Sequence, residues 1–531
     1  MKHFFKFRFC LHPQFLIFFL TLLITNNGLC VEQIIHPFEK ENVKASTNLI
    51  DKMVMVKLHE KGIKSANLCS DEVFIRRVYL DVIGTLPKPY EVIQFLRDNR
   101  PNKRARLIDE LLQRDEFADY WSLKGCDLLR VKSEFPINLW PYGAQVYHRW
   151  VRDSIRENKP YDLFVRELLT SSGSNFRVPP VNFYRAVQSH DSTTLASAVA
   201  LTFMGTRLEK WPESKRLEMA AFFSRVGYKK TDEWKEEIVY LNPTFTTSLN
   251  AVFPDGRKVT IAPDQDPRKV FADWLISPKN PWFARNIVNR IWAWLIGRGI
   301  IQAPDDIRQD NPHVNPALLS YLEKELITFN YDLKHIFRII LNSRTYQQSS
   351  IPQSDNPDAD KLFAHYIVRR LDAETLIDAL DWIGGTGETY TSAIPEPFTN
   401  IPDYKRTISL ADGSITSQFL ELFGRPARDS GLESERNNDP TDAQQLYLLN
   451  SNEIQNKIQK SYRLRKLVSD NKRNVPSIIR GIYITVLSRY PTQSELGTAG
   501  KNFQTNGANP KQAAEDLAWA LINTKEFLYQ H

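Results

Sequence analysis

The chain has 531 residues, of which 42% are hydrophobic and 25% are charged, and its formal net charge is +7. This composition is typical of an ordinary globular protein and excludes a disordered or fibrous chain. Because one hydrophobic core rarely grows beyond about 300 residues, we expect two or three domains. The small excess of positive charge gives no case for a nucleic-acid partner.

The N-terminus has the pattern of a secretory signal peptide. Three basic residues precede an apolar run over residues 15–24, which is typical of an export signal. An uncleaved membrane anchor is the alternative, but a spanning helix needs roughly 20 apolar residues. We predict cleavage after Gly28-Leu29-Cys30, so residues 1–30 form the signal peptide; lipid modification of Cys30 is the other processing route.

Cleavage would change both the charge and the cysteine content. Loss of Lys2, Lys6 and Arg8 lowers the formal charge from +7 to about +4. Only Cys69 and Cys126 remain, which is compatible with one disulfide or with two free thiols. We expect an exported protein, periplasmic or extracellular, with no transmembrane helix after leader removal.

Residues 31–69 are assigned to an N-terminal extension, and a helical pattern begins at Ser70. Apolar residues then recur three and four positions apart, with breaks at prolines such as Pro87 and Pro89. We predict a helical domain over residues 70–235.

Short β-type runs replace this pattern between residues 236 and 265. Ile238-Val239-Tyr240 and Val259-Thr260-Ile261 flank Phe253-Pro254-Asp255-Gly256, which is typical of a turn. Helical periodicity returns at Asp266, so residues 266–531 are predicted to form a second helical domain. The predicted fold class is mainly α, with multi-helix N- and C-terminal domains joined by a short β-containing segment.

Local patterns in the second domain predict helix ends. Asn315-Pro316 places a cap and a first-turn proline before a helix, and Thr492 with Glu495 forms a capping box. Residues 384–440 lack a clear period and are predicted to wrap the surface. Leu341–Tyr346 is similar to Ile522–Phe527, which we interpret as a recurrent helix exit.

Asp305, Asp306 and Asp310 form the candidate metal site. Loop carboxylates at this spacing can bind calcium, but the glycine and distal glutamate of a helix-loop-helix calcium site are missing. Solvated loop charge is the alternative. The histidines are scattered and no cysteine-histidine cluster occurs, so we predict no zinc site.

Glu433, Glu435 and Arg436 are the candidate catalytic residues. Paired carboxylates can serve as acid and base when burial separates their pKa values. A structural ion pair with an arginine is the alternative use of these charges. His190-Asp191-Ser192 lacks spatial partners and no Gly-x-Ser-x-Gly elbow occurs, so we predict no serine nucleophile.

Two motifs in the N-terminal block, Phe74–Gly84 with Pro87 and Asn182–Arg185, resemble a planctomycete cytochrome-type family called domain of unknown function 1549. Many of its members carry Cys-x-x-Cys-His, the signature of covalently attached haem. Here Met204–Glu209 runs directly into Lys210-Trp211, and the cysteine-bearing insertion is absent. The resemblance therefore implies a scaffold without the family's haem motif, and we predict no cofactor; non-covalent haem on isolated histidines is the alternative.

A series of motifs in the C-terminal block resembles the partner family, domain of unknown function 1553. They are Ala272–Leu275, Asn280-Pro281, Val288–Trp292, Gly297–Gly299, Asp305-Asp306, Tyr331–Lys334, Leu341–Tyr346, Phe423–Pro426, Leu448–Asn450 and Glu526–Leu528. That family commonly has Cys-Glu-Cys-Glu-Arg where this chain has Leu432-Glu433-Ser434-Glu435-Arg436. Neither resemblance implies an established reaction.

We weigh three functional hypotheses. The first is a secreted, haem-free binding or assembly protein on a cytochrome-like scaffold, with an unknown extracytoplasmic protein or polymer as its partner. The second is an exported enzyme, hydrolytic or redox-linked, whose carboxylates Asp305, Asp306, Glu433 and Glu435 would have to converge. The third is an electron-transfer accessory to a separate cytochrome.

Overall fold

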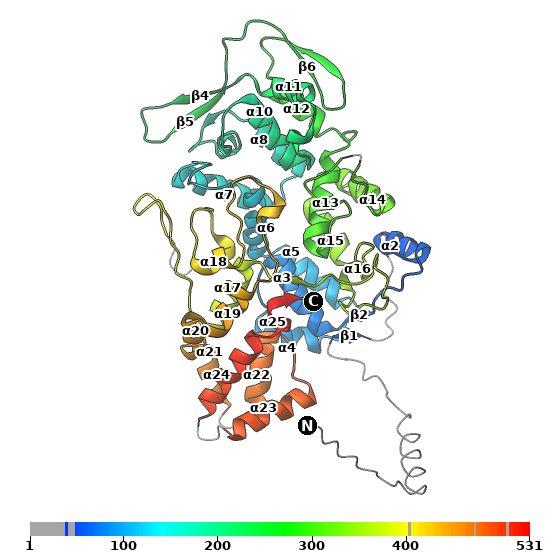
Figure 1. The fold of residues 1–531 in the computed structure, drawn as a ribbon, viewed down its shortest axis with the longest axis vertical. Helices are drawn as coiled ribbons and strands as arrows, with labels where there is room; N and C mark the ends of the chain where they lie inside the picture. Colours follow the sequence, from blue (N-terminus) through cyan, green and yellow to red (C-terminus); the bar gives the residue numbers. More distant parts are fainter. Residues whose placement is uncertain (1–37, 41–47, 309, 402–404, 472–473, 506–508) are drawn as a thin grey trace, which may run out of the picture.

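A computed structural model describes residues 38–40, 48–308, 310–401, 405–471, 474–505 and 509–531. Helices account for 54% of the chain and strands for 6%, which confirms the mainly helical fold class. Figure 1 shows an elongated molecule, with the β-containing region at one end and the helices α22–α24 at the other. The predicted signal peptide lies outside the described residues.

The N-terminal part is a succession of helices with three very short strands. Its elements are β1 (Glu39–Lys40), α2 (Leu49–Glu60), β2 (Leu68–Cys69), α3 (Asp71–Ile83), α4 (Pro89–Arg97), α5 (Lys103–Leu112), α6 (Asp115–Leu128), α7 (Pro141–Arg156), α8 (Tyr161–Thr170), β3 (Gly173–Ser174), α9 (Asn182–Arg185), α10 (Ser192–Val199) and α11 (Glu213–Ala220). The Ser70 hydroxyl caps α3 by accepting from the Val73 amide, as the helical start at Ser70 predicts.

The β region contains four strands, two more than predicted. They are β4 (Val226–Lys230), β5 (Glu237–Leu241), β6 (Leu249–Val252) and β7 (Lys258–Ile261). Strands β3, β5 and β4 form one antiparallel sheet, and β6 pairs with β7 across the predicted turn. The runs predicted at residues 238–240 and 259–261 are confirmed, whereas β4 falls inside the block predicted as helical because five residues are too few to show a period.

The C-terminal part is again helical. Its elements are α12 (Pro267–Leu275), α13 (Phe283–Ile296), α14 (Pro316–Thr328), α15 (Leu333–Leu341), α16 (Arg344–Gln347), β8 (Arg369–Arg370), α17 (Ala373–Gly384), α18 (Gln418–Leu422), α19 (Asp442–Asn450), α20 (Asn452–Gln459), α21 (Tyr462–Asp470), α22 (Val475–Leu487), α23 (Gln493–Thr505), α24 (Pro510–Ile522), α25 (Lys525–Leu528) and β9 (Tyr529–Gln530). The Asn315 side chain caps α14. Thr492 and Glu495 exchange side-chain and backbone hydrogen bonds at the start of α23, so both predicted helix starts are confirmed.

Two hydrophobic cores hold these elements together. The larger core includes buried side chains from α2 to α16 and continues across the β region, while the smaller core is built mainly from α17–α25. Leu80 of α3 and Leu86 join the smaller core. The boundaries predicted at residues 235 and 266 therefore do not coincide with the division of the core.

Helix α3 lies at the centre of the molecule beside α25 (Figure 1). The Arg77 guanidinium donates to the carbonyl oxygen of Tyr346 at 2.7 Å, and that of Arg76 donates to the carbonyl oxygen of Phe527 at 3.0 Å. These two carbonyls occupy the same position in α16 and α25, each a four-residue helix capped by a serine or threonine hydroxyl. The similar segments are thus recurrent helix exits, as predicted, and adjacent arginines of α3 bind both.

Contrary to the prediction, residues 384–440 do not stay at the surface. Thr407, Asp412, Phe419 and Arg428 are all buried. The missing period reflects an irregular backbone whose polar groups find partners inside the protein, an arrangement that hydrophobic patterning does not detect.

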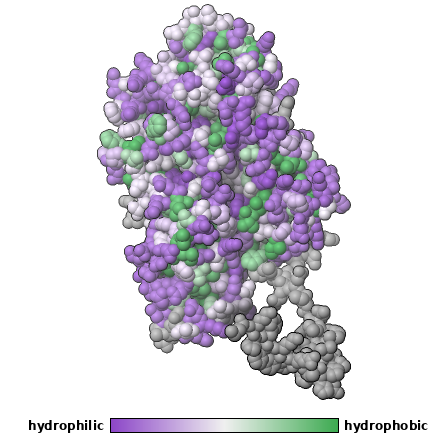
Figure 2. Space-filling view, in the orientation of Figure 1, coloured by the Kyte–Doolittle hydropathy of each residue, from purple (hydrophilic) through white to green (hydrophobic). Residues whose placement is uncertain are grey.

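Among the residues that the structure describes, no helix combines the length and apolar character needed to cross a bilayer. Figure 2 shows a mostly hydrophilic face on which hydrophobic side chains form small, separate groups. Scattered groups of this kind are normal on a protein surface.

Candidate functional site

A polar cavity of about 240 Å³ lies where α3, α6 and α13 meet α17 and β9. We call it the central polar cavity. Four cationic and three carboxylate side chains line it, together with tyrosine, tryptophan and amide groups. Its polar lining consists of Asp81, Tyr120, Trp121, Lys124, Trp294, Arg369, Arg370, Asp372, Thr375, Glu433, Arg436, Asn438 and Gln530. Both the N-terminal and the C-terminal part of the chain therefore contribute to it.

Asp81 of α3 lines the cavity and connects several segments by hydrogen bonds. It accepts hydrogen bonds from the hydroxyls of Tyr346 and Tyr366 at 2.8 and 3.1 Å and from the Gln530 amide at 2.8 Å. Arg369 also donates to it and forms an ion pair. Every partner is a donor, which is the pattern that an ionised carboxylate requires. Asp81 thus ties β8 and β9 to α3.

Tyr120 and Lys124 come from one face of α6, because residues four apart lie above one another on a helix. Both contact Asp372: Lys124 Nζ lies 2.6 Å from its carboxylate, and the Tyr120 hydroxyl donates at 2.9 Å. Asn438 donates to the other carboxylate oxygen at 2.8 Å. Although burial opposes its charge, Lys124 and Arg436 hold the pKa of Asp372 well below its ordinary value.

Arg436 lines the cavity and binds carboxylates that lie behind the cavity wall. Its guanidinium forms two hydrogen bonds to Glu374, at 2.7 and 3.1 Å, and one to Asp127 at 2.7 Å. Glu374 is fully buried in the first turn of α17, where the helix dipole favours a negative charge. Arg428 binds the other oxygen of Asp127 at 2.9 Å. Arg436 therefore forms structural ion pairs, but with Glu374 and Asp127. The predicted ion pair between a motif carboxylate and an arginine is the one between Glu433 and Arg290, 3.6 Å apart.

Glu433 reaches the cavity from a short 3-10 turn over Glu433–Glu435. The Trp294 indole donates to its carboxylate at 2.8 Å, and Arg290 lies 3.6 Å away. Its side chain keeps 30% of its surface exposed. Burial and the negative charge of Asp305 raise the pKa of Glu433, against the opposing influence of Arg290. Burial also raises the pKa of Asp81, against the opposing influence of Arg369, but Glu433 is the more exposed of the two carboxyls.

Asp305 lies close to Glu433. The enzyme hypothesis requires this convergence of its four carboxylates. Asp305 is buried, pairs with Arg290 at 2.6 Å and accepts the Glu433 backbone amide at 2.6 Å. Helix α13 positions its loop: Gly297 ends the helix in the left-handed conformation, and the Asn289 side chain binds both polar backbone groups of Ile301. Asp305 itself is absent from the cavity lining.

The other predicted carboxylates do not join them. Asp306 pairs with Lys210 and Arg308, each at 3.1 Å, and Asp310 pairs with Arg308 at 2.8 Å. Glu435 accepts hydrogen bonds from the amide and hydroxyl of Ser430. The four carboxylates of the enzyme hypothesis therefore converge only in part.

The three carboxylates of the candidate metal site do not converge on one position where an ion could bind. Asp305, Asp306 and Asp310 each face a basic side chain. Within the described ranges, no group of three or more His, Cys, Asp or Glu residues is placed to hold a metal ion. Calcium binding by this loop stays a prediction without support from the geometry.

Cys69 and Cys126 are buried and both are free thiols. Burial raises the pKa of Cys126 to about 12, so this thiol stays protonated and unreactive at neutral pH. The two cysteines serve here as small core residues.

The fold and this cavity define a two-part helical protein whose parts share one polar site. Residues 49–226 match the family PSCyt2, a protein of unknown function (DUF1549), and residues 267–502 match PSD1, a protein of unknown function (DUF1553). The chain belongs to the proteins in which a PSCyt2 region is followed by a PSD1 region. PSCyt2 is a planctomycete cytochrome-type family. Neither a curated protein nor a solved structure matches the chain.

Most residues of the cavity were not predictable as a site. Asp81, Lys124 and Asp372 lie far apart in the sequence, and Lys124 and Asp372 occur in segments with no recognisable motif. Glu433 and Arg436 are predictable because paired carboxylates stand next to an arginine in Glu433-Ser434-Glu435-Arg436. The one signal for Asp81 is its place in the Phe74–Gly84 motif, one helical turn after Arg77.

Proposed function

We propose that this protein is an exported, haem-free binding protein that holds a small polar molecule, or one terminal unit of a polymer, in the central polar cavity. The observation that carries the proposal is the cavity itself, with charged side chains from both family regions around one space. Its volume of about 240 Å³ lies just below the range typical of drug-sized ligands. The occupant is therefore small.

The lining supports recognition of hydroxyl and carboxylate groups. Lys124, Arg369 and Arg436 are fixed by Asp372, Asp81 and Glu374 before any ligand arrives. Such pre-organisation reduces the ordering that binding would otherwise require. Because cations outnumber carboxylates in the lining, a ligand with one negative charge suits the cavity better than a cationic one.

A binding screen with hydroxycarboxylates tests the proposal. Glucuronate, gluconate and lactate, each with one carboxylate, are the probes; glucose is the uncharged comparison, and calorimetry measures affinity. Ala293→Leu places a larger side chain on α13 in the cavity wall and should weaken binding of any positive probe by at least about tenfold. Glu421→Gln, an exposed position outside the lining, is the matched control. Equal binding to the Ala293→Leu protein would place the ligand elsewhere.

A second candidate function is favoured by the opposite pKa shifts of two carboxylates. In the same cavity, burial and Asp305 raise the pKa of Glu433, whereas Lys124 and Arg436 lower that of Asp372 despite burial. Two carboxyls that line one cavity and have pKa values shifted in opposite directions are the arrangement used in general acid–base catalysis. We propose, as this alternative, an exported hydrolase in which Glu433 transfers the proton.

The Glu433→Gln protein separates the two candidates. Glutamine keeps the acceptor for the Trp294 indole but cannot transfer a proton. A hydrolase that acts on chromogenic glycosides or esters would lose at least about a hundredfold in kcat while keeping its affinity. Turnover that disappears in this variant would overturn the binding-protein proposal. Turnover that persists unchanged would overturn the role of Glu433.

A further inference from the structure

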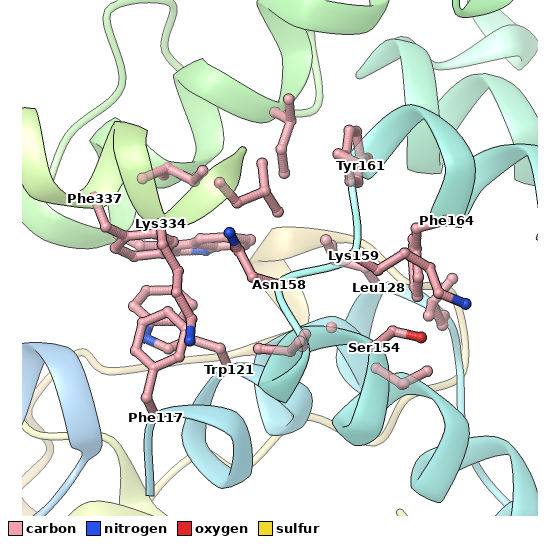
Figure 3. A pocket seen from close by; sticks show the side chains of 18 of the residues that line it. Phe117, Trp121, Leu128, Ser154, Asn158, Lys159, Tyr161, Phe164, Lys334 and Phe337 are labelled. Atoms are coloured by element: carbon pink, nitrogen blue, oxygen red, sulfur yellow. The ribbon is translucent and has the colours of Figure 1, made fainter. Parts of the chain in front are cut away.

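A second cavity lies on the other side of Trp121 and Trp294, between α6, α13 and α15. Its volume is about 100 Å³. Figure 3 shows its aromatic lining, in which Phe117, Trp121 and Phe337 gather around one end. Ile291, Leu128 and Trp294 complete the apolar wall. We call this space the aromatic cavity; it is separate from the central polar cavity and independent of the function proposed for it.

The side chain of a lysine without an ion-pair partner among the described residues lies within this apolar lining. Lys334 of α15 is only 7% exposed, and Figure 3 shows its side chain extending along the cavity toward Phe117. Its ammonium lies 5.3 Å from the centre of the Phe117 ring. Among the residues that the structure describes, no carboxylate lies within ion-pair distance of it. Buried lysines without a partner are rare because desolvation of an unpaired charge is unfavourable.

The neighbouring polar groups explain why Lys334 remains unpaired. The nearest acidic residue in sequence, Asp332, caps α15 through the His335 amide and also accepts from Asn158 at 2.9 Å. The other lysine of the lining, Lys159, lies 2.8 Å from Glu167. Burial lowers the pKa of Lys334 although Asp332 opposes the shift. The positive charge of Lys334 thus lacks the compensation that the other charged groups around it have.

We propose that the aromatic cavity binds a small apolar carboxylate, with the hydrocarbon against Phe117, Trp121 and Phe337 and the carboxylate paired with Lys334. A dry, apolar cavity of roughly 150 Å³ holds benzene. At about 100 Å³, the aromatic cavity is smaller and accommodates a chain of about four or five carbons rather than a six-membered ring. An anionic headgroup is selected over a neutral or cationic one because it alone forms an ion pair with the Lys334 ammonium.

Three probes of equal chain length test the assignment: hexanoate, hexanol and hexylamine. Calorimetry on the full-length protein should show hexanoate binding at least about tenfold more tightly than hexanol, since a charge-assisted hydrogen bond is lost in the alcohol. Hexylamine should not bind. The proposal is overturned if hexanoate does not bind at millimolar concentration, or if hexanol binds equally well.

Two lysine variants assign the charge. Lys334→Met keeps the apolar stem and should weaken hexanoate binding by at least about tenfold, with hexanol affinity kept within about twofold. Lys159→Met is the matched control, because that lysine lines the same cavity but already has a carboxylate partner; hexanoate affinity should stay within about twofold. Thermal unfolding checks that both variants fold. If Lys334→Met proves unstable, Lys334→Arg serves instead and should retain hexanoate binding. Loss of affinity in Lys159→Met but not at Lys334 would overturn the assignment.

Discussion

The aromatic cavity and the central polar cavity share the side chains of Trp121 and Trp294. They differ in whether their charged side chains have partners. Around the polar cavity, Asp81, Asp372 and Arg436 each have two or more charged or hydrogen-bonding partners. In the aromatic cavity, the Lys334 ammonium lies over the Phe117 ring and forms no ion pair with a carboxylate of the described residues. A buried charge is therefore informative about ligands when its surroundings leave it unpaired, and informative about stability when they pair it.

The largest effect is expected from removing Arg436, the centre of the paired charges. Arg436→Met leaves the fully buried Glu374 with only Arg425, whose guanidinium is 3.6 Å away. Breaking a buried ion pair from one side destabilises a protein by about 3–5 kcal/mol. Urea unfolding followed by circular dichroism should show a loss of this size.

Arg436→Lys is the informative companion variant. Lysine keeps the charge but cannot form the two-pronged contact with Glu374, so an intermediate loss is expected. A change below about 1 kcal/mol in the Met variant would mean that the paired charges do not hold the two parts of the protein together.

The next largest effect on stability is expected from a substitution in the wall of the aromatic cavity. Ile291 is 1% exposed and lines the aromatic cavity, so Ile291→Ala should destabilise the protein by about 2–4 kcal/mol. The variant also enlarges the cavity, and it should therefore favour octanoate over hexanoate relative to the unmodified protein. Ile291→Val, with an expected loss of about 1 kcal/mol, is the control. Unchanged chain-length preference would show that ligands do not enter beside Ile291.

The contrast between the cavities also explains what the sequence could predict. Helices, two strands and the caps at Asn315 and Thr492 depend on local spacing, and these predictions are confirmed. The polar cavity depends on contacts such as Asp81 with Gln530, which join positions more than four hundred residues apart. Nothing local distinguishes Lys124 from an exposed helix lysine. Residues 384–440 were assigned to the surface because they lack a period, although this irregular segment carries Glu433 and Arg436 into the interior.

The shared wall can be tested directly with Trp294→Phe. The substitution removes the hydrogen bond to Glu433 and part of the partition between the cavities, so a loss of about 1–2 kcal/mol is expected. Affinity for hexanoate and for the hydroxycarboxylate probes should change together in this variant. Phe117→Leu, which alters only the aromatic cavity, should change hexanoate binding alone. Independent responses to Trp294→Phe would show that the cavities do not share this wall in solution.

The smallest expected effect is a pH dependence at Glu433. The pKa of this carboxyl is raised in the folded protein, above the value of about 4.3 in an unfolded chain. The folded state therefore favours the protonated form, and its contribution to stability is greatest below about pH 4 and is lost as the pH rises through the raised pKa. Glu433→Gln removes this loss without stranding Arg290, which keeps Asp305 at 2.6 Å.

Relative to the unmodified protein, Glu433→Gln should consequently gain up to about 1 kcal/mol at pH 8 and little or nothing at pH 4, with the gain limited by the exposure of the side chain. Urea midpoints at the two pH values measure the difference. Glu435→Gln is the comparison on the same turn, because Glu435 accepts from Ser430 outside the cavity. A Glu433→Gln protein that is less stable than the unmodified one at pH 8 would mean that Arg290 holds Glu433 ionised. The polar cavity would then have only paired charges, and the proton-transfer alternative would lose its acid.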